Sequence, residues 1–146
     1  MNTKGRLLIV DDEPMILKWL KANLEDLADD VLTAENGLQA ISLLQSEEVH
    51  CVICDINMPK LNGVEVIKRL RVFNKDLPFI FYTGHGNSEL MLEAATYGAF
   101  DFLNKPDMDG LEDVVERGLK QGFTKVDVPL EIDDVMTEFQ KMVKAL

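Results

Sequence analysis

Residues 49–65 read V-H-C-V-I-C-D-I-N-M-P-K-L-N-G-V-E, and this pattern points to one kind of sheet. The first part, residues 49–54, is mostly apolar and predicts a buried strand. Asp55 follows directly, and Pro59 and Gly63 disfavour both a longer strand and an immediate helix. The sequence therefore predicts a carboxylate held in a loop at the end of a buried strand.

Three further apolar runs end in polar side chains in the same way. They are residues 7–10 before Asp11 and Asp12, residues 79–82 before Thr83, and residues 100–103 before Lys105. If these runs are strands of one parallel sheet, their polar ends share the edge where open α/β sheets bind ligands. Carboxylates gathered there repel one another, so a cation is expected among them, and oxygen ligands favour Mg²⁺ or a similarly hard ion.

Helical and extended patterns alternate along the chain. Apolar residues recur at helical spacing over residues 14–28, 38–46, 64–74, 90–97 and 110–121, between strands predicted at 6–10, 31–34, 49–54, 79–82 and 100–103. Met15 and Trp19 flank the first helical stripe and are expected to pack. Five β-α repeats predict a doubly wound, five-stranded parallel sheet with helices on both faces. In the strand order 2-1-3-4-5, Asp11 and Asp12 lie beside Asp55.

Composition limits the classes of partner. The chain has 146 residues and a net charge of -11, with no basic stripe, so nucleic-acid binding is not expected. No apolar stretch is long enough to cross a bilayer and no signal-peptide core is present, so we expect a cytoplasmic protein without a membrane partner. Cys51 and Cys54 stand three residues apart on a strand, on opposite faces, which favours two small buried side chains over a metal or redox pair.

The pattern changes after residue 122. We predict one domain over residues 1–122, followed over 123–146 by a linker and an extra amphipathic C-terminal helix. The apolar stripe of that helix comprises Ile132, Val135, Met136, Phe139, Val143 and Leu146. Such a stripe either folds back on its own domain or forms a surface for a homodimer or another partner.

Four motifs together resemble the receiver domain of two-component response regulators, in its stand-alone chemotaxis form. They are L-L-I-V-D-D-E-P at 7–14, D-I-N-M-P-K-L-N-G-V-E at 55–65, F-Y-T-G at 81–84 and G-A-F-D-F-L-N-K-P at 98–106. The resemblance spans about residues 4–121 and implies a flavodoxin-like (βα)5 fold. It also implies a histidine kinase or phosphotransfer protein as phosphoryl donor, and a downstream protein target or an output domain elsewhere.

The same resemblance implies the roles of the acidic residues. Asp55 accepts the phosphoryl group. Mg²⁺ is held by Asp12, Asp55 and the backbone carbonyl of Asn57, with Asp11 acting through water. The resulting acyl phosphate is hydrolysed by water, so the chain is expected to be a timed switch and not a turnover enzyme.

Other positions are assigned by the resemblance as well. Thr83 hydrogen-bonds a phosphoryl oxygen, and Lys105, which precedes a proline in a peptide that the family keeps cis, pairs with another. Thr83 and Phe102 form the switch, with a phenyl ring where tyrosine is frequent. His85 is expected to face the phosphoryl group, and Asp107 adds an acid at the rim of the site.

Two alternatives stay open beside this reading. One is a Mg²⁺-dependent aspartyl phosphotransferase or phosphatase, which requires an acid shortly after its nucleophile, where this chain has Asn57. The other is a degenerate receiver that acts as a constitutive interaction or dimerisation domain. The presence of Asp55, Thr83 and Lys105 together argues against the second alternative.

Overall fold

Strands and helices alternate along the residues described by the computed structural model, which are 3–84 and 88–127. The strands are β1 (Arg6–Val10), β2 (Asp30–Ala34), β3 (Cys51–Cys54), β4 (Phe79–Thr83) and β5 (Asp101–Asn104). The helices are α1 (Pro14–Leu24), α2 (Gly37–Ser46), α3 (Gly63–Phe73), α4 (Ser88–Thr96) and α5 (Met108–Asp127), with a 3-10 turn, η1 (Glu25–Leu27), after α1. This alternation confirms the predicted β-α repeat.

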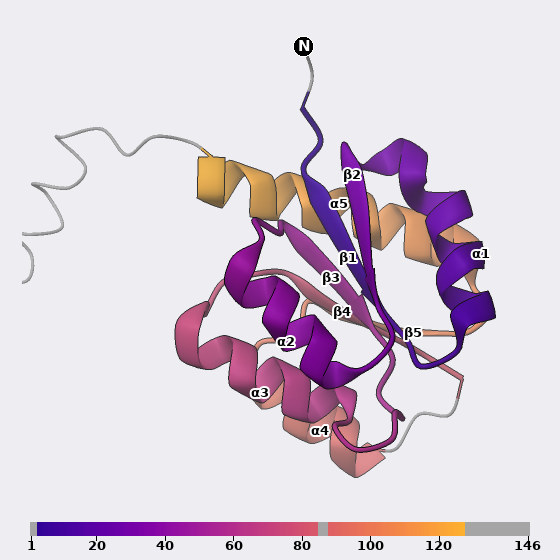
Figure 1. Cartoon of the computed structure of the whole chain (residues 1–146), viewed down its shortest axis with the longest axis vertical. Coiled ribbons are helices and arrows are strands. Elements are labelled where there is room, and N and C mark those ends of the chain that lie inside the picture. The colour runs from indigo at the N-terminus through magenta and orange to yellow at the C-terminus, as the bar shows by residue number, and fades with distance from the viewer. Residues whose placement is uncertain (1–2, 85–87, 128–146) are drawn as a thin grey trace, which may run out of the picture.

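The strands form one parallel sheet in the order β2-β1-β3-β4-β5, as predicted. Figure 1 shows α2, α3 and α4 on one face of this sheet and α1 and α5 on the other. Leu7 pairs with Cys51 and Val10 with Cys54, so β1 and β3 end at the same level. The loops that follow these two strands therefore start side by side.

Each face of the sheet has its own apolar core, which is why all four residues of β3 are buried. Cys54 belongs to the core beneath α2, α3 and α4, together with Phe79 and Phe81. Cys51 belongs to the core beneath α1 and α5. The two thiols point to opposite faces, as predicted, and burial raises the pKa of both.

Two helices end at other places than the sequence pattern indicates. α1 stops at Leu24, because residues 25–27 tighten into the 3-10 turn. α5 runs to Asp127, past the boundary predicted after residue 122, because Phe123 finds a packing partner in the ring of His50, 5.2 Å away. Residues 123–127, which were predicted to begin the linker, continue α5 instead. The rest of the predicted linker and the predicted C-terminal helix lie outside the described residues, as does any dimer contact that they make.

The packing role predicted for Met15 and Trp19 is wrong. Met15 is 77% exposed and Trp19 is 42% exposed. The side chains of α1 that are buried are Leu17, Leu20 and Leu24, whose spacing of three and four residues keeps them on one stripe. Met15 and Trp19 lie off that stripe and face solvent.

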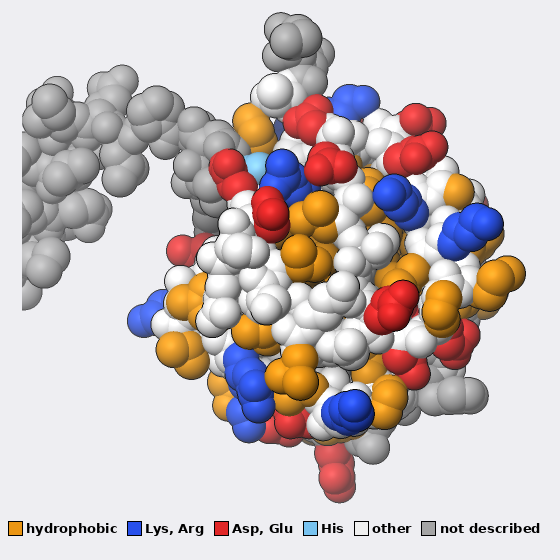
Figure 2. Space-filling model, in the orientation of Figure 1, with side chains coloured by type: hydrophobic (Ala, Val, Ile, Leu, Met, Phe, Trp, Pro, Cys, Tyr) orange, Lys and Arg blue, Asp and Glu red, His pale blue; other side chains and the backbone are white. Residues whose placement is uncertain are grey.

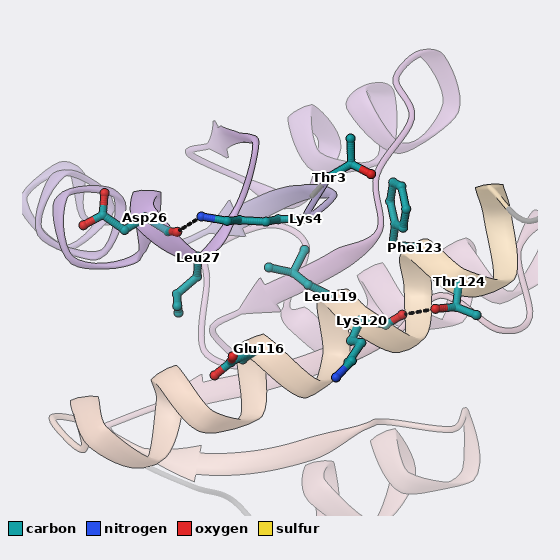
Figure 3. A pocket seen from close by; sticks show the side chains of 9 residues that line it. All are labelled: Thr3, Lys4, Asp26, Leu27, Glu116, Leu119, Lys120, Phe123 and Thr124. Atoms are coloured by element: carbon teal, nitrogen blue, oxygen red, sulfur yellow. Dashed lines mark hydrogen bonds between the residues drawn. The ribbon is translucent and has the colours of Figure 1, made fainter. Parts of the chain in front are cut away.

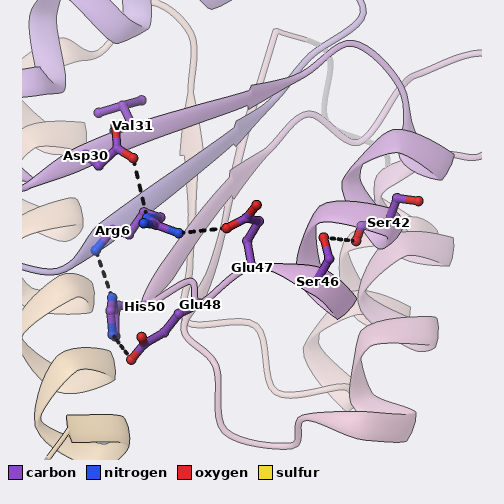
Figure 4. A network of polar contacts seen from close by, with 8 residues as sticks. All are labelled: Arg6, Asp30, Val31, Ser42, Ser46, Glu47, Glu48 and His50. Atoms are coloured by element: carbon purple, nitrogen blue, oxygen red, sulfur yellow. Dashed lines mark hydrogen bonds and ion pairs between the residues drawn. The ribbon is translucent and has the colours of Figure 1, made fainter.

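His50 is buried and makes several contacts, which its position before β3 does not suggest. It is 5% exposed, and the backbone N–H of Arg6 donates to its Nδ1 over 2.8 Å. Its Nε2 lies 3.3 Å from a carboxylate oxygen of Glu48, and the Arg6 side chain lies 3.0 Å from Glu47 (Figure 4). These contacts tie the starts of β1 and β3 together. Acidic side chains are also concentrated at this end of the molecule in Figure 2.

None of the helices formed by the described residues is long and apolar enough to cross a membrane.

Candidate functional site

Three carboxylates meet where β1 and β3 end. Asp11 and Asp12 follow β1 and Asp55 follows β3, and each offers an oxygen within 4.8 Å of the other two. Asp11 is 1% exposed and Asp55 is 8% exposed, whereas Asp12 is open to solvent. The structure thus brings together the acids that the strand order predicted. One face of the cluster is accessible to a ligand.

Backbone contacts hold Asp55 in place. Its N–H donates to the carbonyl of Val10 over 3.1 Å, and the N–H of Gly63 donates to the carbonyl of Ile56 over 2.9 Å. Asn62 closes a capping box with the first turn of α3, which fixes where that helix begins. A Cβ at Gly63 would collide with the carbonyl oxygen of Asp55. Gly63 is therefore required because α3 starts in contact with the loop of Asp55, which its sequence position alone does not reveal.

Lys105 supplies the cation of the site. Its Nζ lies 2.8 Å from Asp11 Oδ2 and 3.1 Å from Asp55 Oδ2, and its side chain is 18% exposed. Its backbone N–H donates to the carbonyl of Thr83 over 3.0 Å, which anchors it to the end of β4. The peptide bond to Pro106 is cis, as the resemblance implies.

Burial and charge set the protonation of this cluster. Burial raises the pKa of Asp11, although the hydrogen bonds from Lys105 and from the backbone N–H of Glu13 oppose the shift. Burial alone lowers the pKa of Lys105, but the hydrogen bond to Asp11 and the charge of Asp55 outweigh it, so that pKa is raised. Lys105 therefore stays protonated at neutral pH among the acids.

Thr83 lies at the end of β4, the strand next to β3. Its side chain is 3% exposed, and its hydroxyl is one of two buried side-chain oxygens in the described residues that lack a hydrogen-bond partner. The other is the hydroxyl of Tyr82. Because an unmade hydrogen bond is costly in a buried place, the Thr83 hydroxyl can take a partner other than the residues that the structure describes.

Four predicted residues remain. Asn57 is exposed after β3, and its N–H points at Asp55 Oδ1 over 3.4 Å. The Phe102 ring is stacked on the buried ring of Phe81, with centroids 5.4 Å apart. Asp107 caps the start of α5, since its side chain accepts the N–H of Gly110 over 2.9 Å. His85 lies outside the described residues.

The oxygen donors fit a divalent cation. Asp11, Asp12 and Asp55 bring their carboxylates within the mutual distances that a single small ion can span, and a hard ion prefers such oxygens. The one cationic side chain that contacts these acids in the described residues, Lys105, balances only part of their charge. The site is an acidic pocket suited to metal binding.

A doubly wound sheet of this order binds its ligands at the β1/β3 crevice, where this chain has an acid cluster and a lysine. Residues 7–116 match the family model of the response regulator receiver domain, and the chain belongs to this family.

Several relatives agree with this assignment. A chemotaxis protein CheY homolog of Campylobacter jejuni is 36% identical over 126 residues, covering 80% of this chain and 97% of the homolog. The transcriptional regulatory protein FixJ of Bradyrhizobium diazoefficiens is 32% identical over 83% of this chain. The chain spans 60% of FixJ and 28% of the transcriptional regulatory protein GlrR of Escherichia coli.

Solved structures agree as well. A response regulator receiver domain protein from Clostridium thermocellum is 29% identical with a TM-score of 0.74, covering 80% of this chain and 94% of that one. A structure described as adenylate cyclase from Rhodopirellula baltica is 28% identical with a TM-score of 0.75, covering 99% of this chain and 100% of that one. The chain is a receiver domain of the two-component response regulator type, and phosphorylation-activated signalling is its expected function.

Proposed function

We propose that Asp55 accepts a phosphoryl group from a phosphohistidine of a histidine kinase or phosphotransfer protein, with Mg²⁺ in the acidic pocket. One observation carries this proposal: the Asp55 carboxylate pairs with Lys105, is grouped with two further acids, and lies next to a strand that ends in a buried hydroxyl with no hydrogen-bond partner among the described residues. Asp11, Asp12, Asp55 and the backbone of Asn57 are the groups that would hold Mg²⁺, which would supply positive charge to stabilise the phosphoryl oxygens.

Each remaining residue has a role in the transfer. An oxygen of Asp55 forms the new bond to phosphorus, while the bond from phosphorus to the donor histidine nitrogen breaks and its electron pair stays on the imidazole. Lys105 Nζ, 3.1 Å from Asp55 Oδ2, stabilises the negative charge on one phosphoryl oxygen. The Thr83 hydroxyl donates to another. Water later cleaves the acyl phosphate and restores the carboxylate, so the chain acts as a timed switch and not as a turnover enzyme.

Thr83 and Phe102 transmit phosphorylation of Asp55 to the surface of the domain. When the Thr83 hydroxyl moves to a phosphoryl oxygen, it leaves space beside the ring of Phe102, which packs against Phe81. Phe102 carries no hydroxyl, so its position is governed by packing alone. The surface of α4, β5 and α5 changes as a result.

The output of the switch lies on another protein or on another domain. FixJ, of which this chain spans 60%, is named a transcriptional regulatory protein, whereas the Campylobacter CheY homolog is spanned almost entirely. Partner chains of either kind would meet the changed surface in the cytoplasm, where histidine kinases deliver their phosphoryl groups.

Intact-mass spectrometry after incubation with acetyl phosphate and Mg²⁺ tests the proposal. The wild-type chain should gain one phosphoryl group, and Asp55→Asn and a metal-free sample should not. Asp107→Asn is the matched control, because Asp107 is an exposed acid near the site and asparagine also caps helices. The absence of any adduct would favour the degenerate receiver, and an adduct in Asp55→Asn would place the acceptor elsewhere.

A further inference from the structure

A groove lies at the end of the sheet opposite Asp55. It encloses about 540 Å³ between η1, the residues that precede β1, and the last turns of α5 (Figure 3). Lys4 lines it and stands before β1, whereas the acidic pocket follows that strand. A ligand in this groove would therefore leave the acidic pocket open.

The groove has an apolar floor and a charged rim. The floor is formed by Leu27 of η1 and by Leu119 and Phe123 of α5, whose side chains Figure 3 shows between the two elements. On the α5 side of the rim, Glu116 and Lys120 are exposed, one helical turn apart. Such a surface suits an amphipathic helix with charges beside its apolar stripe.

The chain itself supplies a segment of this kind. Thr124 lines the groove, and the described part of α5 ends three residues later at Asp127. Pro129 disfavours helical backbone at the residue before it, so the sequence favours a change of direction there. Residues 132–146 would form a helix about 22 Å long at 1.5 Å per residue, which matches the length of α5 from Thr124 back to about Leu111.

We propose that residues 132–146 fold back antiparallel to α5 and seat their apolar stripe in this groove. The order of the charges supports that direction. Read backward along α5, the side chains Lys120, Glu116 and Glu112 follow one another at helical spacing. Read forward along the tail, Glu138, Lys141 and Lys144 fall within two residues of the positions opposite them and carry the complementary signs.

The same register leaves residues 128–131 as the connection between two antiparallel helices, which matches the short loops of helical hairpins. It also sets Thr124 opposite Asp134. The proposed docking of residues 132–146 requires only the groove and the sequence of the tail. It does not depend on phosphorylation of Asp55.

Cysteine pairing in the full chain tests the register. Thr124→Cys with Asp134→Cys should form a disulfide within one chain under mild oxidation, visible as a monomer that has lost two hydrogens by intact mass. Cys51 and Cys54 are buried and do not compete. Thr96→Cys with Asp134→Cys is the control, because Thr96 is exposed on α4. A disulfide-linked dimer would show that a second copy covers the stripe, and the absence of a disulfide would equally overturn the proposal.

Stability of the full chain gives an independent readout. Phe139→Asp should lower the melting temperature by about 5 °C, independently of protein concentration. The neighbouring Gln140→Asp should leave it unchanged, because residue 140 lies off the stripe. Both variants should still form the acetyl-phosphate adduct, which separates this proposal from the chemistry at Asp55. The proposal would be refuted if Phe139→Asp and wild type had the same melting temperature, or if the decrease in melting temperature depended on protein concentration.

Discussion

Lys105 Nζ lies 2.8 Å from Asp11 Oδ2, so a cation that follows β5 is paired with an acid that follows β1. Because β3 and β4 lie between β1 and β5 in the sheet, this ion pair spans the ends of two intervening strands. The second contact, from Lys105 to Asp55, makes the lysine the counter-ion of two nearly buried carboxylates.

Lys105→Met should lower the free energy of unfolding by about 2 kcal/mol at pH 7, because it leaves Asp11 and Asp55 without their cation. Urea unfolding without divalent ions measures this change. Lys68→Met is the control, since the pair of Lys68 with Glu93 is exposed to solvent and should contribute much less to stability. Equal effects of the two substitutions would show that the Lys105 contacts add nothing beyond a surface pair.

Asp11 should make the stability of the domain depend on pH. Its pKa is raised in the folded state, so the folded chain holds this proton more tightly than the unfolded chain does. The free energy of unfolding should therefore fall as pH rises from the ordinary value of 3.8 through the higher folded pKa, and then level off.

Asp11→Asn removes that titration, so the stability of the variant relative to wild type should increase over this pH range. Urea unfolding at a series of pH values gives the difference. Asp113→Asn, at an exposed acid paired with Arg117, is the control. A pH-independent difference for Asp11→Asn would contradict the prediction.

Mg²⁺ should stabilise the folded chain through the acidic pocket. At about ten times its dissociation constant it should raise the free energy of unfolding by about 1.4 kcal/mol, since binding to the folded state alone shifts the equilibrium. Asp12→Asn should abolish that gain. Asp30→Asn should retain it, because Asp30 lies at the opposite end of the sheet. Stabilisation by Mg²⁺ that survives in Asp12→Asn would place the ion elsewhere.

Thr83→Val should raise the free energy of unfolding by about 1 kcal/mol, because it removes a buried hydroxyl that has no hydrogen-bond partner among the described residues and keeps the shape of the side chain. Thr96→Val is the contrast: its hydroxyl donates to the carbonyl of Glu93 over 2.6 Å, so that substitution should lower the value slightly. Chemical denaturation of both variants shows whether each substitution raises or lowers the free energy of unfolding. Destabilisation by Thr83→Val would mean that its hydroxyl is already satisfied in solution.

Gly122→Ala should destabilise the domain by about 2 to 3 kcal/mol, because a Cβ there would overlap the carbonyl oxygen of His50. Gly84→Ala serves as the control. The nearest atom to its Cβ, Lys105 Cδ, is 3.9 Å away, and the change should stay within about 0.5 kcal/mol. Thermal melting compares the two. A mild effect at Gly122 would show that α5 can move away from the start of β3.

Much of the fold and of the pocket could be predicted from short-range pattern. The apolar runs before Asp12, Asp55 and Thr83 predict buried strands, since a strand buried on both faces is continuously apolar. The alternation with helices then requires a parallel sheet, and a parallel sheet places the residues after its strands at one edge. Asp11, Asp12 and Asp55 were therefore predicted to be neighbours, and they are.

Other features depend on contacts between distant parts of the chain. His50 is buried because Arg6 and Phe123 meet it, and Phe123 also extends α5 beyond the predicted boundary. Trp19 is exposed because no element within residues 3–84 and 88–127 covers its side of α1. Periodicity and turn residues act over a few positions and so can be recognised along the sequence. Three features arise only when segments tens of residues apart pack together: the burial of His50, the pairing of Lys105 with Asp11 and the groove beside α5. Each of them requires residues from two distant segments, so neither segment alone predicts it.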